Sequence, residues 1–215
     1  MNSSRFFDFI VENGGSPVID WPRLRRLDSV LDVGSFDGLS LAVLYHDFGF
    51  QTLHGVDLRT EAQIVRELSE RTGTQFSSLY EYYKIALTTG GEPRMTIAQF
   101  ESRLRFEFGT DFFSSGGEVF GKYDLVVCSN VLHEMFYEQQ VRHCLNRLKD
   151  SLEENGSVFI SVKERPAGAV HRKFAMDAYD DMVEHVFGQS FEVGRISLTT
   201  EEEGTALVYT NLLLA

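Results

Sequence analysis

The sequence predicts an α/β fold: a Rossmann-like, doubly wound sheet of seven strands, mostly parallel, with an antiparallel hairpin at its C-terminal end. Strand-like apolar runs alternate with helix-like segments along most of the 215 residues, which is typical of a parallel sheet. The run Tyr123–Cys128 is apolar with almost no alternation, as in a strand buried on both faces. Two strand-like runs follow each other at the C-terminus, and they indicate the hairpin.

The first half of the sheet is expected to begin with a strand, a helix, a strand and a helix. Ser29–Gly34 is a short apolar strand that ends in an acid and a glycine, and Leu39–Phe48 follows as a helix. Gln51–Asp57 is a second strand and again ends in an acid. Thr60 can cap the next helix, which runs to about Arg71.

The second half is expected to continue the alternation and then to close with the hairpin. Its elements are strands at Arg103–Phe108 and Tyr123–Cys128, a helix at Glu138–Glu153 closed by Asn155-Gly156, a strand at Ser157–Val162, a helix at Ala169–Phe187, and strands at Phe191–Leu198 and Ala206–Leu214.

The length suits one α/β domain at residues 29–215, preceded by a cap at residues 1–28 that contains a helix at Ser4–Glu12. An aromatic-rich insertion at about residues 75–100 interrupts the alternation. Because a helix after the second strand returns the chain to the N-terminal edge of the sheet, the insertion is expected to start far from the ligand edge. It is interpreted as a packing or subunit contact, with a substrate lid as the alternative.

Composition disfavours several classes of protein. With 32 acidic and 20 basic residues the formal charge is −12, which disfavours nucleic acid as a partner. No apolar run reaches the roughly 20 residues of a membrane span, and no signal peptide is visible. Cys128 and Cys144 form no disulfide pattern, which favours a reducing cytoplasm. A homodimer remains open.

A candidate ligand site follows the first two strands, where open α/β sheets bind ligands. Gly34 and Gly38 in the first turn let the backbone turn tightly and approach a ligand. Asp57, 23 residues after Gly34, has the spacing of a carboxylate that accepts both hydroxyls of an adenosine ribose.

The turn also distinguishes between nucleotide ligands. A dinucleotide rests its pyrophosphate on the helix N-terminus and needs a bare glycine in mid-loop. The chain has Phe36 and Asp37 there, so the ring blocks the approach and the carboxylate repels an anion. S-adenosylmethionine carries a sulfonium and an ammonium group, which tolerate Asp32 and Asp37. The turn therefore favours this cofactor over NAD.

Five segments resemble the signatures of class I S-adenosylmethionine-dependent methyltransferases. They are Val30–Gly38 and Leu53–Leu58 for the first two signatures, Gly109–Phe112 for the adenine-contacting turn, Tyr123–Glu134 for the fourth strand and Gly156–Ile160 for the fifth. The resemblance covers about residues 29–165, and the terminal hairpin agrees with it. The chain departs from the family at Phe36, where glycine is usual.

The resemblance implies a role for each matched residue. Gly34 and the region of Asp32 hold the methionine end of the cofactor, Asp57 binds the ribose and Leu58 packs on the adenine. The full set of cofactor-binding candidates is Asp32, Gly34, Ser35, Gly38, Asp57, Leu58, Asp111 (accepting the adenine amino group), Phe112 (through its amide) and Ser129 (near the methionine end). The alternative is structural: Asp32 and Asp111 can cap turns, and Asp57 can cap a helix.

His133 is the candidate general base, because it follows the fourth strand on the ligand edge and a neutral imidazole can accept a proton near pH 7. His133-Glu134 resembles the histidine element of small-molecule O-methyltransferases, and a purely structural histidine is the alternative. No metal site is expected, since position 137 is Tyr137 rather than a second zinc-binding histidine.

A basic group after the fifth strand, comprising Lys163, Arg165, Arg172 and Lys173 around Glu164, can hold a carboxylate or phosphate of the acceptor, or it forms a solvated loop. The function expected is methylation of a small molecule, with oxygen as the favoured acceptor atom. The alternatives are a non-catalytic binding module of the same fold and an NAD-dependent oxidoreductase.

Overall fold

The computed structural model describes residues 19–86, 96–114, 120–129, 131–135, 137–163, 176–188, 190, 192–200 and 204–213. The predicted helix Ser4–Glu12 lies outside these residues. The strands in the described part are β1 (Ser29–Val33), β2 (Thr52–Asp57), β3 (Leu104–Phe108), β4 (Tyr123–Ser129), β5 (Leu152–Lys163), β6 (Gly194–Thr200) and β7 (Gly204–Thr210).

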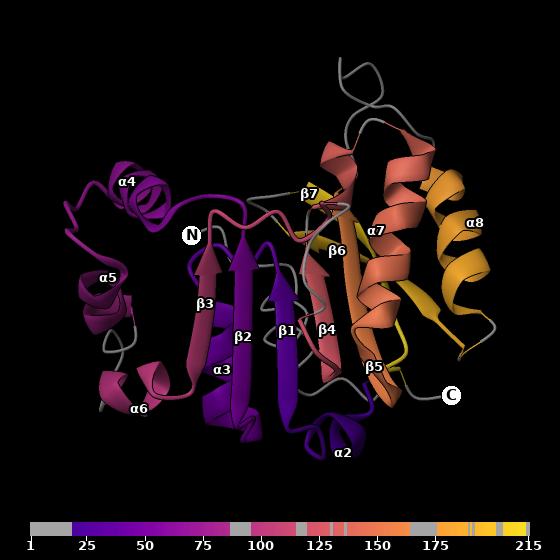
Figure 1. Cartoon of the computed structure of the whole chain (residues 1–215), viewed down its shortest axis with the longest axis horizontal. Coiled ribbons are helices and arrows are strands. Elements are labelled where there is room, and N and C mark those ends of the chain that lie inside the picture. Colours follow the sequence, from indigo (N-terminus) through magenta and orange to yellow (C-terminus); the bar gives the residue numbers. More distant parts are fainter. Residues whose placement is uncertain are drawn as a thin grey trace.

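These strands form one seven-stranded sheet in the order β3-β2-β1-β4-β5-β7-β6. The strands β1 to β5 pair in parallel, whereas β7 pairs antiparallel with both β5 and β6. The predicted fold class is therefore confirmed. The carboxyl ends of β1, β2, β3 and β4 meet at one edge, which is the upper edge in Figure 1.

The described helices are α2 (Trp21–Leu24), α3 (Leu39–Phe48), α4 (Glu61–Thr72), α5 (Leu79–Ala86), α6 (Ile97–Glu101), α7 (Glu138–Asp150) and α8 (Met176–Phe187), together with a short 3-10 helix, η1 (Leu132–Glu134). The helices α7 and α8 cover one face of the sheet at β5, and α3 lies behind β2 on the opposite face (Figure 1). Within the described residues, no helix combines the length and the apolar character that a membrane crossing needs.

The two faces of the sheet are covered by two separate hydrophobic cores. Neighbouring residues of a strand point to opposite faces, so Val30 packs with Leu41 of α3, whereas Leu31 belongs with Leu145 of α7. All four side chains are fully buried. Burial on both faces explains why the central strands read as nearly continuous apolar runs.

The strand order reverses direction at β1, which lies between β2 and β4. The crossover after β1 leads to β2 on one side, and β4 pairs with β1 on the other side. At such a switch point the loops after the neighbouring strands separate, and open α/β sheets bind ligands in the crevice that results. The fold therefore places the turns after β1, β2 and β4 around one crevice.

The strand β5 begins at Leu152 rather than at the predicted Ser157. Leu152 pairs with Tyr123 of β4, and a register shift separates this pair from the regular ladder that follows. Asn155 and Gly156, which the sequence pattern assigns to the end of a helix, therefore lie in an irregular stretch of the strand.

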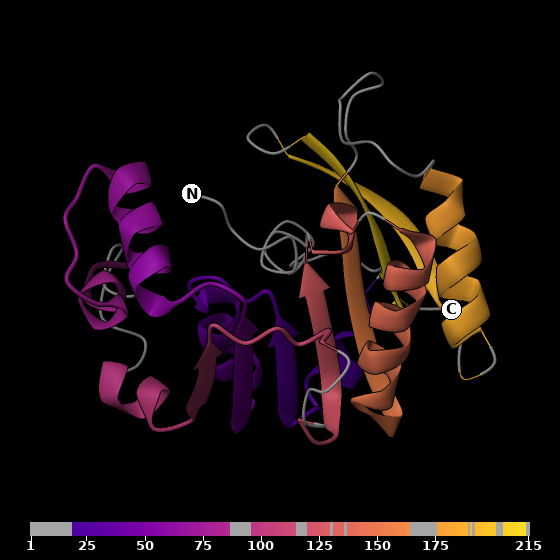
Figure 2. The same cartoon turned by 45° about the horizontal axis from the view of Figure 1, so that its top comes forward.

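The insertion begins close to the ligand edge, so the prediction that it starts far from that edge is wrong, and α6 at its end lies near the opposite edge (Figure 1). The helix α4 lies level with the carboxyl ends of the strands, and α5 lies directly below it at the β3 end of the sheet (Figure 1). Figure 2 shows the same arrangement, with α4 and α5 at the end of the sheet opposite the hairpin. The hydroxyl groups of Tyr82 and Tyr83 in α5 donate to Asp37 at 2.9 and 2.7 Å. The insertion thus supports the turn after β1.

Candidate functional site

A cavity of about 530 Å³ opens at the carboxyl ends of β1, β2 and β4. Its volume lies in the range of small-molecule and cofactor sites, roughly 300–1,000 Å³. The lining residues are Val33, Gly34, Ser35, Phe36, Asp37, Val56, Asp57, Leu58, Arg59, Arg71, Thr110, Asp111, Phe112, Phe113, Ser129, Val131, Glu134 and Met135. Among the predicted cofactor residues, Asp32 and Gly38 are not part of this lining, and the others are.

The turn after β1 depends on glycine at its first position. Gly34 has a φ of 77°, a left-handed conformation that glycine adopts without strain. Its N–H donates to the carbonyl of Val56 at 2.8 Å. A Cβ atom added here would come closer to Cγ2 of Val131 than two carbon atoms can approach. The bare backbone of Gly34 therefore forms part of the cavity wall because no side chain fits.

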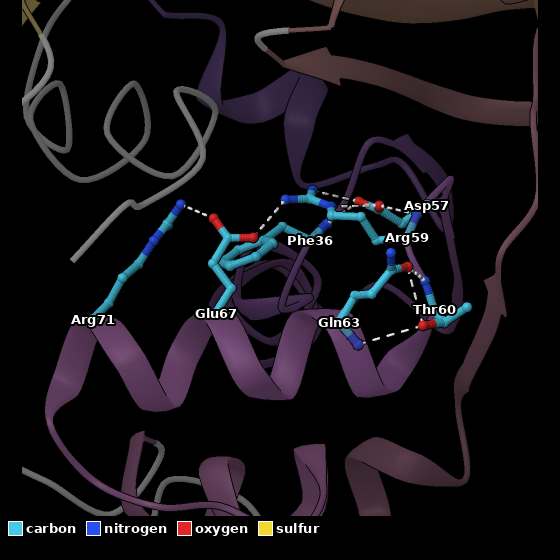
Figure 3. A network of polar contacts seen from close by, with 7 residues as sticks. All are labelled: Phe36, Asp57, Arg59, Thr60, Gln63, Glu67 and Arg71. Carbon is cyan, nitrogen blue, oxygen red and sulfur yellow. Dashed lines mark hydrogen bonds and ion pairs between the residues drawn. The ribbon is translucent and has the colours of Figure 1, made fainter.

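Phe36 is a non-glycine residue with a positive φ, 50°. Its ring forms one wall of the cavity and leaves the cavity open. The guanidinium carbons of Arg59 and Arg71 lie 4.5 and 4.9 Å from the ring centroid, within the range of cation–π contacts. Two cations thus hold the ring in place where the family usually has glycine (Figure 3).

Asp57 ends β2 with its carboxylate in the cavity, and only 3% of the residue is exposed. Burial raises the pKa of this carboxyl, but hydrogen bonds and charge from Arg59, with a further hydrogen bond from the amide of Phe36, lower the pKa below its ordinary value. Asp57 is therefore an ionised acceptor at the place where the spacing predicted a sugar-binding carboxylate.

Arg59 belongs to a chain of alternating charges along α4. Asp57, Arg59, Glu67 and Arg71 follow one another in this order, each paired with the next (Figure 3). Neither Arg59 nor Arg71 was among the predicted site residues. The position of Arg59, two residues after Asp57, was the one sequence feature that could have indicated the ion pair between them. Nothing in the sequence links Arg71 to the cavity.

Asp32 lies beneath the turn after β1 and is 1% exposed. Among the described residues, neither oxygen of its carboxylate has a hydrogen-bond partner. Burial, followed by the negative charges of Asp57 and Asp37, raises the pKa of Asp32 to about 8. Asp32 is not part of the cavity lining, and its expected place near the methionine end of the cofactor stays a prediction.

Asp37 lies at the start of α3 and is 7% exposed. Its Oδ1 accepts the amide of Leu39, the first residue of α3, at 3.1 Å, and its Oδ2 accepts the hydroxyl of Tyr82. Burial raises the pKa of Asp37 to about 6, while these two hydrogen bonds oppose the rise. A carboxylate of the protein itself therefore lies at the positive end of this helix.

The remaining predicted residues form the other walls of the cavity. Leu58 is a large apolar side chain that is 69% exposed. Oδ1 of Asp111 accepts the amide of Phe113 at 3.0 Å, which is the turn-capping geometry considered as its alternative role. Phe112 is buried, and Ser129 accepts a 3.3 Å hydrogen bond from Ser161.

His133 lies in η1, directly after β4, but its side chain is outside the described part of the structure. Its neighbours Glu134 and Met135 line the cavity. Of the basic group after β5, only Lys163 is described, and residues 164–175 lie outside the described part. Within the described residues, no group of three or more His, Cys, Asp or Glu side chains could hold a metal ion.

A family model and several solved structures relate the chain to known proteins. A family model described as "Methyltransferase domain" matches residues 5–204. A search of curated proteins found no match.

Among solved structures, an O-methyltransferase family protein from Burkholderia thailandensis is 15% identical with a TM-score of 0.53, and the match covers 87% of this chain and 52% of that one. The chain thus spans about half the length of that protein. The methyltransferase domain of bacterial CtHen1-C is 13% identical with a TM-score of 0.59, and the match covers 97% of both chains.

A third solved structure is the 1,6-didemethyltoxoflavin-N1-methyltransferase of Burkholderia thailandensis, with its substrate and S-adenosylhomocysteine bound. It is 17% identical with a TM-score of 0.53, and the match covers 96% of this chain and 85% of that one. These likenesses agree in fold with the strand order found here. The family model spans most of the chain, including the turns after β1 and β2 that border the cavity. The chain belongs to the class I methyltransferases, whose methyl donor is S-adenosylmethionine.

Proposed function

We propose that this protein methylates a small molecule, with oxygen favoured over nitrogen or carbon as the acceptor atom. Binding of the cofactor is supported by one observation: Gly34 and Asp57 line the same cavity. A turn without a side chain and an ionised carboxylate that can accept the sugar hydroxyls therefore lie on adjacent walls. S-adenosylmethionine supplies an already activated methyl group when bound. The residues therefore have to hold, orient and dehydrate the reacting groups.

The cavity residues suit different parts of the cofactor. The backbone of Gly34 and Ser35, together with Ser129, is assigned to the methionine end. Asp57 is assigned to the two ribose hydroxyls. Leu58 supports an adenine site, because a large apolar side chain that is 69% exposed at a cavity wall gains free energy when a planar base covers it.

Asp111 and Phe112 are assigned to the edge of the adenine. The amide of Phe112 can face the ring, and the carboxylate of Asp111 retains acceptor sites besides the hydrogen bond from Phe113. Both residues line the same cavity as Leu58. The assigned positions thus extend over four parts of the cavity wall, formed by the turns after β1, β2 and β3 and by the end of β4 at Ser129.

A dinucleotide does not suit this cavity. Its pyrophosphate would need the N-terminus of α3, where the carboxylate of Asp37 already accepts the amide of Leu39. The pKa of Asp37, about 6, keeps most of this carboxyl ionised at pH 7, so an approaching phosphate meets a negative charge. The geometry therefore supports a cationic cofactor over NAD.

The acceptor is assigned to the side of the cavity formed by the loop after β4, where Val131, Glu134 and Met135 line the wall. His133 in the same loop is the proposed general base, and Lys163 with the basic residues that follow it is proposed to hold an anionic group of the acceptor. The predicted helix Ser4–Glu12 is proposed to close over this side, whereas α2 lies at the opposite edge of the sheet (Figure 1). The two free, buried cysteines support a reducing cytoplasm, and a homodimer remains part of the proposal.

The acceptor assignment is tested by methyl transfer from labelled S-adenosylmethionine to a panel of phenols, hydroxy acids, amines and thiols. We expect transfer to hydroxyl acceptors, and we expect His133→Ala to lower turnover while the affinity for S-adenosylhomocysteine stays within twofold. Transfer to amines alone would show that the acceptor atom is nitrogen and not oxygen. Cofactor binding without turnover on any acceptor would instead support a non-catalytic binding module.

A further inference from the structure

The carboxylate of Asp57 receives four hydrogen bonds. Oδ1 accepts the amide of Arg59 at 2.9 Å and its Nε at 2.8 Å. Oδ2 accepts the amide of Phe36 at 2.9 Å and Nη2 of Arg59 at 2.8 Å. An ionised carboxylate offers about four lone-pair sites. Every acceptor site of this carboxylate is therefore filled.

The four donors are of two kinds. The amides of Phe36 and Arg59 are fixed by the turns after β1 and β2. The other two donors belong to a guanidinium group at the end of a flexible side chain that is 38% exposed. This group presents two nearly parallel N–H bonds to the two oxygens, as the vicinal hydroxyl groups of a ribose would present two O–H bonds. The side chain of Arg59 therefore occupies the acceptor sites that a sugar needs.

A second location for the guanidinium lies beside the first. Nη1 of Arg59 is 3.3 Å from Oε2 of Glu67 on α4. The ring centroid of Phe36 lies 4.5 Å from the guanidinium carbon, so this side chain already contacts both Glu67 and the ring (Figure 3). Displacement from Asp57 thus leaves Arg59 with a carboxylate and an aromatic face, so its charge is still compensated.

We propose that Arg59 competes with the ribose of the cofactor for Asp57. The guanidinium fills the two sugar-binding sites before the cofactor enters, and it keeps only its contacts with Glu67 and the ring of Phe36 when the sugar takes its place. This inference rests on the proposed role of Asp57 as the ribose acceptor. It makes Arg59 a determinant of cofactor affinity. It also favours a nucleoside with both hydroxyls, because one hydroxyl replaces only one of the two guanidinium bonds.

The test is calorimetric titration with S-adenosylhomocysteine of the full chain and three variants. Arg59→Met keeps most of the side-chain stem and removes the two competing donors, so we expect binding at least fivefold tighter. Glu67→Gln removes the charge that receives the displaced guanidinium, so we expect binding at least threefold weaker. In the double variant Arg59→Met/Glu67→Gln the effect of Glu67 should disappear.

Arg66→Met is the matched control, because Arg66 is exposed on the same helix and is not part of the cavity lining. It removes one positive charge from α4 and should change the affinity less than twofold. If Arg59→Met does not fold, Arg59→Lys replaces it, and we expect the point charge of lysine to compete less than the guanidinium fork. The Nε resonance of Arg59 should shift when S-adenosylhomocysteine is added to the unchanged protein.

Unchanged or weaker binding by Arg59→Met, or by the lysine variant in its place, would overturn the inference, since the guanidinium would then be neutral or itself a ligand of the cofactor. A similar gain in affinity from Arg66→Met would also overturn the inference, because the loss of any positive charge on α4 would then explain the tighter binding. If neither the unchanged protein nor Arg59→Met binds S-adenosylhomocysteine, the proposed role of Asp57 fails first, and the inference fails with it.

Discussion

Burial of the Asp32 carboxyl group predicts a specific dependence of the folding stability on pH. This carboxylate is buried under the turn after β1, without a hydrogen-bond partner among the described residues, and its pKa is raised from 3.8 to about 8. Between these two pH values the folded chain keeps a proton that the unfolded chain releases. The stabilisation linked to this proton is complete below pH 4 and is lost as the pH rises towards 8.

The magnitude follows from the linkage of one proton. The free energy of unfolding should fall by about 1.4 kcal/mol per pH unit, or about 2.7 kcal/mol between pH 5 and pH 7. Asp32→Asn has nearly the same shape and no titratable group. The amide adds its own burial cost, but this cost does not depend on pH. The difference between the two proteins should therefore change by about 2.7 kcal/mol over this interval.

The assay is urea unfolding of both proteins at pH 5, 6 and 7, analysed at a constant slope of free energy against denaturant. Asp181→Asn is the control, because Asp181 is an exposed carboxylate on α8. The control should follow the pH dependence of the unchanged protein. If Asp32→Asn also follows it, the carboxylate is ionised across the interval, and the account of an unpartnered acid under the turn is incorrect.

Two further substitutions test the turn after β1. Tyr82→Phe removes the hydroxyl that donates to Asp37, so we expect the free energy of unfolding in urea to fall by about 1.5–3 kcal/mol. Tyr80→Phe, on the exposed side of α5, should change this free energy little. Equal effects of the two substitutions would show that the contact between Tyr82 and Asp37 does not stabilise the fold. Gly34→Ala puts a methyl group against Val131 and strains the left-handed backbone by about 1–2 kcal/mol, so the affinity for S-adenosylhomocysteine should fall at least tenfold. An unchanged affinity would show that the turn does not border the cofactor.

Most of the sheet could be predicted because its signals are local. The apolar runs around Val30, Leu53 and Leu125 mark strands buried on both faces, and each lies in a fully buried position of the observed sheet. The acids and glycines at the strand ends are local signals too, and they mark the ligand edge. The start of β5 could not be predicted, because the register shift beside Tyr123 depends on pairing between distant strands.

The candidate site was predictable where residues follow strands directly. Gly34, Asp57 and Ser129 each follow or end a strand, so topology alone brings them to one edge. The support of Asp37 by Tyr82 joins residues 45 positions apart in the chain and has no sequence pattern. The charge of Arg59 was visible in the sequence, but its bidentate contact with Asp57 depends on a side-chain conformation that only the folded turn defines.

The central claim is that a sulfonium nucleoside, held by the carboxylate of Asp57, occupies this cavity. Calorimetric titration of the unchanged protein and of Asp57→Ala with S-adenosylhomocysteine and with NAD tests it most directly. We expect the unchanged protein to bind S-adenosylhomocysteine and not NAD. We expect Asp57→Ala to bind S-adenosylhomocysteine at least tenfold more weakly, because charged hydrogen bonds worth about 1.5–3 kcal/mol are lost. Binding of NAD, or equal affinity of the two proteins for S-adenosylhomocysteine, would contradict it.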